Sequence, residues 1–355
     1  AGYEKADGLL QGLLQRNVKD YQALLAQGDN FLQWAEAESD AGGGSAKLES
    51  ARFAYASIID YYGERDEVLL RMMRYFIRLD RMSGQDKLAE TRDLKEYLDS
   101  RRRLRVAPEL LASVYAELGG YWIDKRQLDE APKILFQAMD ARMEVPEIHY
   151  HLARYYREVR EAAEEEKALE AAIELLERTQ PLDKKGLFLL IDSYNRRGET
   201  YYRRQEYLDA EKMFRKAITE IEQAQARRMF GRQPEFGLAY KNQADLYYYV
   251  SRDLVAALDL YEKAAANRYQ SSDLDYKIGY IHYAEERYET ALLAFAEVVD
   301  QKPTNENALF ALANCLYQGG YHASAQGYYL RLLEILEGRE QRIRYLQPME
   351  NPEHR

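Results

Sequence analysis

The sequence has little of what catalysis, metal binding and disulfide bonding require. It contains one cysteine, Cys315, so no disulfide can form within the chain, and it has no apolar run long enough to cross a membrane as a helix. Of its five histidines, His149 and His151 are two residues apart and would point to different sides of a helix. The glycine-rich stretch that ends at Gly44 lacks the Gly-Lys-Ser/Thr succession of a phosphate-binding loop. We therefore expect no enzyme, no cofactor and no metal site, although a pair of carboxylates that meets only in three dimensions stays open.

Acidic residues outnumber basic ones by 60 to 50 and leave a net charge of -10. Such a balance argues against a nucleic-acid partner, since phosphate backbones are bound by lysine and arginine. The one basic run is Arg101-Arg102-Arg103-Leu104-Arg105. We identify no aromatic residue or second basic cluster beside it, so the sequence favours a solvated surface between repeats over a phosphate site.

The lone thiol and the first residues leave the cellular compartment open. Cys315 follows Leu312 and Ala313 at helical spacing, which predicts a packed position in a core. Residues 1–10 lack the charged head and apolar core of a signal peptide, but a processed chain would look the same. The cytoplasm and the bacterial periplasm are both compatible with the sequence.

A helical hairpin is the clearest pattern present, and it runs from Ser271 to Pro303. Gly279 lies in the middle of a first amphipathic helix, and Ala291 and Phe295 lie four apart on a second one that ends before Pro303. The same order of small and aromatic residues returns at Gly198, Ala210 and Phe214, and one period of about 34 residues separates Gly119 from Ala153 and Gly279 from Ala313.

This order resembles the tetratricopeptide repeat (TPR), a helix-turn-helix unit of about 34 residues. The resemblance implies an all-α, TPR-like α-solenoid, a right-handed superhelix of about eight antiparallel helix pairs. A chain of 355 residues fits such an array, because stacked repeats need no single central core. Gly or Ala in the first helix and Ala in the second would let the helices approach closely, and the aromatic residue would fill the space between repeats.

The repeats differ in quality along the chain. Residues 1–107 form an N-terminal helical region with degenerate TPR-like pairs, of which 69–79 and 88–98 rest on periodicity alone. TPR-like repeats follow at 108–222 and 237–337, and a polar tail closes the chain at 338–355. Between the repeats, 223–236 is an extended helix and loop, for which a longer connection is favoured over a functional insertion. We also expect connecting loops at 40–45 and at 160–166, the latter carrying the run Glu164-Glu165-Glu166.

In TPR proteins the first helices line a concave groove that binds an extended peptide or a helix, and the resemblance implies the same here. The groove-facing candidates are Asn195, Glu199, Tyr202, Arg203, Lys241, Asp245, Tyr248, Tyr249, Tyr276, Tyr280, Tyr283, Asn307, Phe310, Asn314 and Tyr317. Tyrosine combines apolar area with a hydrogen-bonding end, so this aromatic stripe favours recognition. Packing between repeats, or occupation by the tail, is the alternative. A chaperone-type carboxylate clamp is disfavoured, because Lys241 is followed one turn later by Asp245 instead of asparagine.

The resemblance therefore implies a non-enzymatic protein–protein interaction scaffold that binds a partner protein or peptide. The alternative is a structural subunit of a larger assembly, for example a bacterial cell-envelope or periplasmic flagellar-motor complex, contacting its neighbours through Leu9, Leu13 and residues 222–236. A homo-oligomer or multiprotein complex, and a helical domain that regulates an attached enzyme, also stay open.

Overall fold

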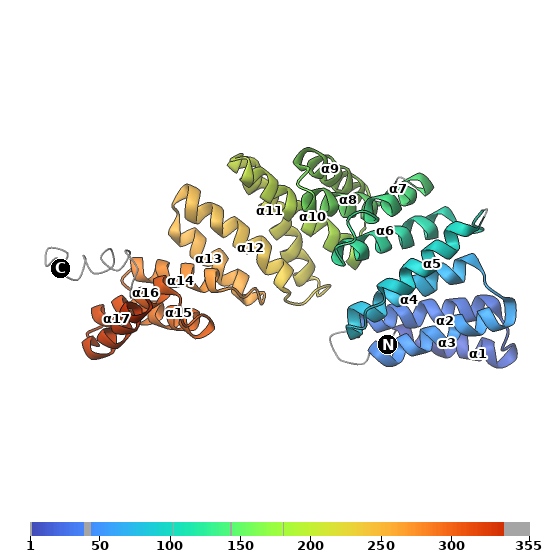
Figure 1. Ribbon diagram of the computed structural model, residues 1–355, viewed down its shortest axis with the longest axis horizontal. Helices are drawn as coiled ribbons and strands as arrows, with labels where there is room; N and C mark the ends of the chain where they lie inside the picture. The colour runs from blue at the N-terminus through green and yellow to red at the C-terminus, as the bar shows by residue number, and fades with distance from the viewer. Residues whose placement is uncertain (1, 39–43, 102, 143, 180, 337–355) are drawn as a thin grey trace. The chain divides into compact units, whose positions relative to one another are not determined.

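The computed structural model describes residues 2–38, 44–101, 103–142, 144–179 and 181–336. Over these ranges the chain is helical and contains no strand (Figure 1). The chain divides into two compact units, Ala1–Leu182 and Asp183–Arg355. Each unit is built from helices that pack against their neighbours in the chain, which is the organisation expected of a solenoid.

Unit 1 holds an N-terminal helix followed by four helix pairs. Its helices are α1 (Gly2–Arg16), α2 (Tyr21–Ala37), α3 (Gly44–Tyr62), α4 (Asp66–Ser83), α5 (Leu88–Ser100), α6 (Pro108–Asp124), α7 (Ala131–Ala141), α8 (Pro146–Glu158) and α9 (Ala162–Arg178). The degenerate pair expected from periodicity alone is confirmed as α4 and α5, so the amphipathic pattern was sufficient to find it.

Unit 2 holds four further pairs. Its helices are α10 (Lys184–Arg203), α11 (Tyr207–Ala226), α12 (Pro234–Leu246) with the π-helical turn η2 (Tyr247–Ser251), α13 (Leu254–Ala266), α14 (Ser272–Ala284), α15 (Tyr288–Gln301), α16 (Glu306–Gln318) and α17 (His322–Leu336). The described helices thus form eight pairs after α1, and the predicted all-α, TPR-like solenoid is confirmed.

Helix starts follow the local sequence. The side chains of Asp20, Asp183 and Ser271 each accept a hydrogen bond from the backbone N–H three residues later, which satisfies one free donor of the first turn. Pro108 and Pro234 occupy the first helical position, where the missing N–H costs nothing. These residues set where each repeat begins.

Glycine in the first helix of a pair allows the second helix to approach closely. A Cβ built on Gly198 would lie 2.5 Å from the ring of Phe214, and one on Gly279 would lie 2.9 Å from the ring of Phe295. Both distances are shorter than a van der Waals contact, so a side chain at either position would require the phenylalanine ring to shift. The repeat pattern of small and aromatic residues is therefore a packing pattern.

One predicted loop is wrong. Residues 160–166 were expected to form a long acidic connection, but α9 begins at Ala162, and Glu164 and Glu165 lie in its first turn. Acidic side chains are stabilised near the positive end of the helix dipole, so the run starts a helix. Glu165 is moreover buried, with 2% of its surface exposed, and is not part of a solvated turn.

The longer connection after α11 folds back onto its own unit. As expected, α11 continues to Ala226, and a loop leads to α12. In that loop the ring of Phe230 packs edge-on against Phe236 at 5.3 Å, and Gln225 Nε2 donates to Asn267 Oδ1 over 2.7 Å. These contacts fix the connection in place.

Two other expectations concern residues that the structure covers little or not at all. The loop at 40–45 lies mostly outside the described residues, and α3 already begins at Gly44. The tail at 338–355 lies outside them entirely.

Cys315 is 1% exposed and packs in the core of unit 2, as predicted, and burial raises the pKa of its thiol to about 11. None of the described helices is long and apolar enough to cross a bilayer.

Candidate partner-binding site

A hollow of about 380 Å³ opens on unit 2 where η2, α14 and α16 come together. We call it the tyrosine pocket, and its lining residues are Tyr248, Tyr249, Ser272, Asp273, Tyr276, Lys277, Lys302, Asn305 and Asn307. Four of the predicted groove residues are therefore brought together here, namely Tyr248, Tyr249, Tyr276 and Asn307. They come from three successive repeats, which is how a solenoid builds a shared surface.

Tyr248 connects Tyr249, which also lines the pocket, to Tyr280, which is outside the lining but contacts Tyr248. Its ring centroid lies 4.9 Å from that of Tyr249 and 6.1 Å from that of Tyr280, and both pairs meet edge to face. Tyr249 and Tyr280 remain 46% and 44% exposed, so they present ring surface to solvent. Burial, and then the neighbouring tyrosines, raises the pKa of Tyr248 to about 12, so its hydroxyl stays protonated at neutral pH.

A π-helical turn carries two of these tyrosines. The helix α12 passes directly into η2, Tyr247–Ser251, and the turn closes at Arg252 with a left-handed φ of 58°. A π-turn widens the helix by one residue, and such turns occur often at functional sites. The turn was not predicted from the sequence, because nothing in the periodicity of Tyr247-Tyr248-Tyr249 distinguishes it from an α-helix.

Lys277 is buried at the side of the pocket and is held by carboxylates. It is 4% exposed, and its Nζ lies 2.9 Å from Asp245 Oδ1 and 2.7 Å from Asp273 Oδ2. Burial alone would lower the pKa of Lys277, but the hydrogen bonds to Asp273 and Asp245 outweigh it and raise the pKa. The ammonium also lies 4.8 Å from the ring centroid of Tyr249, as a cation–π contact.

Asp245 is the shared acceptor of this network. It accepts hydrogen bonds from the Tyr261 hydroxyl over 2.6 Å and from Lys277, and it forms an ion pair with Lys241 at 2.6 Å. Both predicted residues, Lys241 and Asp245, are therefore structural supports behind the pocket and not part of its lining. Lys241 is engaged by a carboxylate of its own helix.

The predicted residues on α10 do not line the pocket. Asn195 is 2% exposed, and its amide oxygen accepts from Asn242 Nδ2, which also donates to Glu199 at 2.8 Å. Tyr202 packs edge-on against Tyr207 at 5.7 Å. Arg203 is exposed at the end of the helix, where its Nη2 donates to Thr200 Oγ1 over 3.1 Å.

The remaining candidates divide between packing and surface. Tyr283 packs against Tyr288 at 5.5 Å, and Phe310 packs against Tyr329 at 6.2 Å. Asn314 accepts a hydrogen bond from the Tyr329 hydroxyl. Tyr317 is 51% exposed, with its ring 4.8 Å from that of His322.

The sequence did not identify the other five lining residues, which are Ser272, Asp273, Lys277, Lys302 and Asn305. Lys277 follows Tyr276 and lies four residues after Asp273, so its spacing to that carboxylate was visible, but its second partner is far away in the chain. Lys302 is exposed at the end of α15. The side chain of Asn305 caps α16 by accepting from the Ala308 N–H over 3.1 Å.

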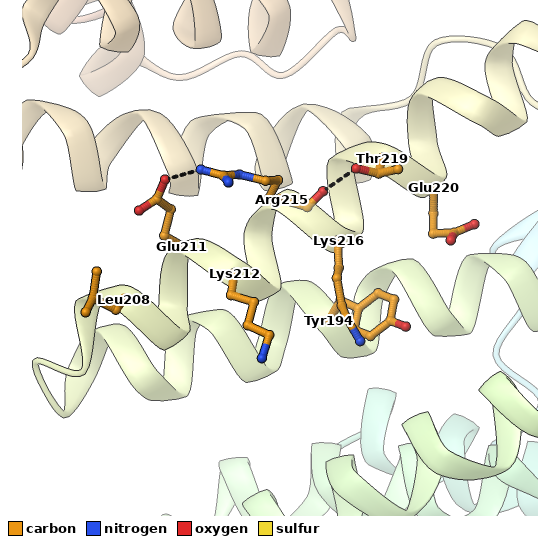
Figure 2. Close-up of a pocket in the computed structure, with 8 residues that line it drawn as sticks. All are labelled: Tyr194, Leu208, Glu211, Lys212, Arg215, Lys216, Thr219 and Glu220. Carbon is orange, nitrogen blue, oxygen red and sulfur yellow. Dashed lines mark hydrogen bonds and ion pairs between the residues drawn. The ribbon is translucent and has the colours of Figure 1, made fainter.

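A second hollow of unit 2, of about 370 Å³, lies along α11 (Figure 2). All its lining residues except Tyr194 come from this one helix, and Figure 2 shows Lys212 and Lys216 pointing to one side of it and Glu211 and Arg215 to the other. The ammonium of Lys216 lies 4.9 Å from the ring centroid of Tyr194. Side chains of one helix that diverge in this way cannot converge on a ligand, so we do not place the site here.

The corresponding first helices of unit 1 are linked by paired charges. Arg74 and Arg78 of α4 lie 2.7 Å and 2.8 Å from the carboxylate of Glu117 on α6, and Arg71 lies 2.8 Å from Asp29 on α2. These arginines and carboxylates form ion pairs that connect the first helices of successive repeats. Across the described residues no cluster of histidine, cysteine or carboxylate side chains has the grouping needed to hold a metal ion.

Comparison with known proteins identifies the same repeat. The family model of the tetratricopeptide repeat matches residues 282–347. The apo form of RapI superposes with a TM-score of 0.57 at 13% identity, over 88% of this chain and 87% of that one. PilF of Pseudomonas aeruginosa superposes with a TM-score of 0.53 at 15% identity, over 69% of this chain and all of that one. No curated protein sequence matches the chain. At such identities the likeness concerns the fold alone.

Proposed function

Because the chain is a tetratricopeptide-repeat protein, we propose that it is a non-enzymatic scaffold and that its tyrosine pocket receives an extended segment of a partner protein. The fold supports protein–protein interaction in general, since stacked helix pairs provide long surfaces for a second chain. The pocket as the place of binding is the proposal. It rests mainly on one observation, which is that the exposed Tyr249 and Tyr280 lie close to Lys277, a buried lysine that forms ion pairs with two aspartates.

The buried charges make the pocket rigid before a partner arrives. Asp245 joins α12 to α13 through Tyr261 and to α14 through Lys277. The tyrosines above this network are held in edge-to-face contacts, so little side-chain freedom is lost on binding. Tyr249 and Tyr280 provide the apolar area, and their hydroxyls provide hydrogen bonds at the rim.

The lining sets the chemistry of the segment. The pocket combines tyrosine rings with the exposed ammonium of Lys302 and the amides of Asn305 and Asn307. An apolar or aromatic side chain of the partner would pack on the rings, and the amides would bond to its backbone. Its volume of about 380 Å³ accommodates a side chain and not a folded surface.

Selection of short peptides from a random library on the full chain tests this assignment. The selected peptides should lose at least tenfold in affinity when Tyr249→Ala and Tyr280→Ala are combined, because aromatic anchors dominate such interfaces. Tyr61→Ala is the matched control, since Tyr61 is 42% exposed on unit 1. Equal loss with the control, or unchanged affinity of the double variant, would remove the pocket as the binding site.

A structural role in a larger assembly is the second candidate, and α1 carries the observation that favours it. This helix has no buried residue, and Leu9 and Leu13 are 67% and 47% exposed. Exposed apolar side chains on one helix suit a contact with a neighbouring subunit. Under this proposal Leu9→Glu with Leu13→Glu would abolish assembly and leave peptide binding at the tyrosine pocket unchanged.

A further inference from the structure

A large cleft of unit 1 combines arginine and tyrosine side chains. Its volume is about 1620 Å³, and it is lined by the end of α3, the start of α4, the end of α5 and residues 103–107, which lead into α6. The sequence placed no aromatic residue beside the basic run at 101–105. The structure corrects this, because the guanidinium of Arg101 lies 4.9 Å from the ring centroid of Tyr97, and Tyr21 and Tyr62 line the same cleft.

The connecting segment is anchored so that alternate residues face outward. Leu104 and Val106 pack against the core of unit 1, whereas Arg103 and Arg105 are exposed. The carboxylate of Asp66, 8% exposed, holds the segment by accepting from Arg101 Nη1 over 2.7 Å and from the backbone N–H of Arg105 over 2.8 Å. The arginines are thereby presented from a fixed backbone.

The acidic residues of the cleft already have partners. Asp66 is occupied by Arg101, Glu64 accepts from the Tyr97 hydroxyl, and Glu67 accepts from the Tyr21 hydroxyl. In contrast, the guanidinium groups of Arg65, Arg103 and Arg105 have no carboxylate within ion-pair distance among the described residues. Besides Arg101, three cationic groups without a carboxylate partner among the described residues therefore line one cleft of a chain whose net charge is -10.

The tyrosine rings add apolar surface to this charge. Tyr21 and Tyr62 meet edge to face with centroids 5.3 Å apart, and the Tyr62 hydroxyl donates to the backbone carbonyl of Lys19. With their hydroxyls bonded to protein, the rings are fixed and can pack against apolar side chains. The cleft thus offers fixed rings beside three arginines.

We propose that this cleft binds an extended acidic segment of a protein partner, with Asp or Glu side chains paired to Arg65, Arg103 and Arg105 and apolar side chains packed on Tyr21 and Tyr62. Arginine binds carboxylates in a two-pronged geometry, which suits this recognition. A nucleic acid fits less well, since its continuous phosphate charge would face a chain whose net charge is -10. The site is separate from the tyrosine pocket and does not depend on it.

Fluorescence anisotropy with the full chain tests the proposal. The probe is a labelled peptide of alternating glutamate and leucine, compared with a glutamine–leucine peptide and with an oligothymidylate of the same length. We expect micromolar binding of the acidic peptide only, and at least a tenfold weakening in the triple variant Arg65→Gln, Arg103→Gln, Arg105→Gln. The matched control is Arg160→Gln, Arg232→Gln, Arg252→Gln, which changes the net charge equally at three exposed arginines elsewhere.

Each other outcome overturns the proposal. Failure of the acidic peptide to bind removes the site, and equal weakening in both triple variants shows unspecific attraction by charge. Tighter binding of the oligothymidylate assigns the cleft to nucleic acid. Circular dichroism of both triple variants checks that they are folded, which is expected because all six side chains are exposed. The Tyr249→Ala, Tyr280→Ala variant should bind the acidic peptide normally, so the two sites can fail separately.

Discussion

The ammonium of Lys277 lies 2.9 Å from the carboxylate of Asp245, and this ion pair ties α14 to α12 beneath the tyrosines of unit 2. Lys277 is 4% exposed and is also bonded to Asp273. Without the Lys277 side chain, Asp245 would keep only Lys241 and Tyr261 as partners. The ion pair that connects α14 to α12 beneath the pocket would then be lost.

We therefore expect Lys277→Met to lower the free energy of unfolding of unit 2 by about 2 to 3 kcal/mol, because hydrogen bonds to a charged partner are lost. Lys263→Met is the control, since Lys263 forms an exposed pair with Asp259 and should cost less than about 1 kcal/mol. Hydrogen exchange of the α12–α14 amides measures the effect. Equal protection in both variants would contradict a supporting role of Lys277.

The alanines at the helix interfaces give a second prediction. Ala210 and Ala291 are completely buried at the start of α11 and α15. Replacement of either by leucine should cost about 1 to 3 kcal/mol through overpacking and lower the melting temperature. Ala284→Leu, at an exposed position, should have little effect. Unchanged thermal unfolding of both buried variants would remove these alanines from the interface.

Most of the fold could be predicted from the sequence because repeat packing is local. The contact of Gly279 with Phe295 joins residues of one hairpin, and it returns in Gly198 with Phe214, so spacing alone reveals it. The acidic run at Glu164 was misinterpreted because charge suggests solvent, whereas the first turn of a helix also favours acidic side chains.

The candidate site was only partly predictable, because burial depends on the neighbouring repeat. Asn195 has the spacing of a groove residue, but Asn242 of the next first helix donates to it, and it is buried. Lys277 could not be found, since its second partner, Asp245, belongs to the preceding repeat. The exposed tyrosines were easier to identify, because an aromatic stripe already stands out along the sequence.

A left-handed backbone conformation in a hairpin turn allows stabilisation by glycine. Gln205 joins α10 to α11 with a φ of 63°, a region that is strained for residues with a Cβ. Gln205→Gly should raise the free energy of unfolding by about 0.5 to 1 kcal/mol, as relief of strain exceeds the entropy cost. Glu206→Gly, where φ is -85°, should destabilise instead. Chemical denaturation measures the change in free energy of unfolding for both variants. A change of the same sign in both would contradict strain at Gln205.

Acid should weaken unit 1 through Asp80. Its Oδ2 accepts from Tyr121 over 2.7 Å and from Lys87 N–H over 2.9 Å, and Lys125 lies 2.8 Å away. Burial alone would raise the pKa of Asp80, but these bonds outweigh it and hold the pKa below its ordinary value of 3.8. A depressed carboxylate pKa stabilises the fold above the ordinary value, and this contribution is lost as the pH falls through the folded pKa.

The matching variant is Asp80→Asn. At neutral pH its free energy of unfolding should be lower than that of the wild type by about 1 to 3 kcal/mol. This difference in stability should become smaller below about pH 4, where Asp80 of the wild type becomes protonated. Asp259 belongs to an exposed ion pair, so the melting temperature of Asp259→Asn should change with pH in the same way as that of the wild type. Melting temperatures measured against pH provide the test, and a gap for Asp80→Asn that stays constant in acid would contradict this assignment.

The central claim is that a partner protein binds at the tyrosine pocket of unit 2, and site-specific photo-crosslinking in the native host tests it most directly. p-Benzoylphenylalanine would replace the exposed Tyr249, Tyr280 and Tyr317 in one set of variants, and Leu9, Leu13 and Met229 in another. The account predicts that Tyr249 and Tyr280 capture the same partner protein. Capture only at Leu9, Leu13 and Met229 would contradict it and show that the chain acts through assembly contacts.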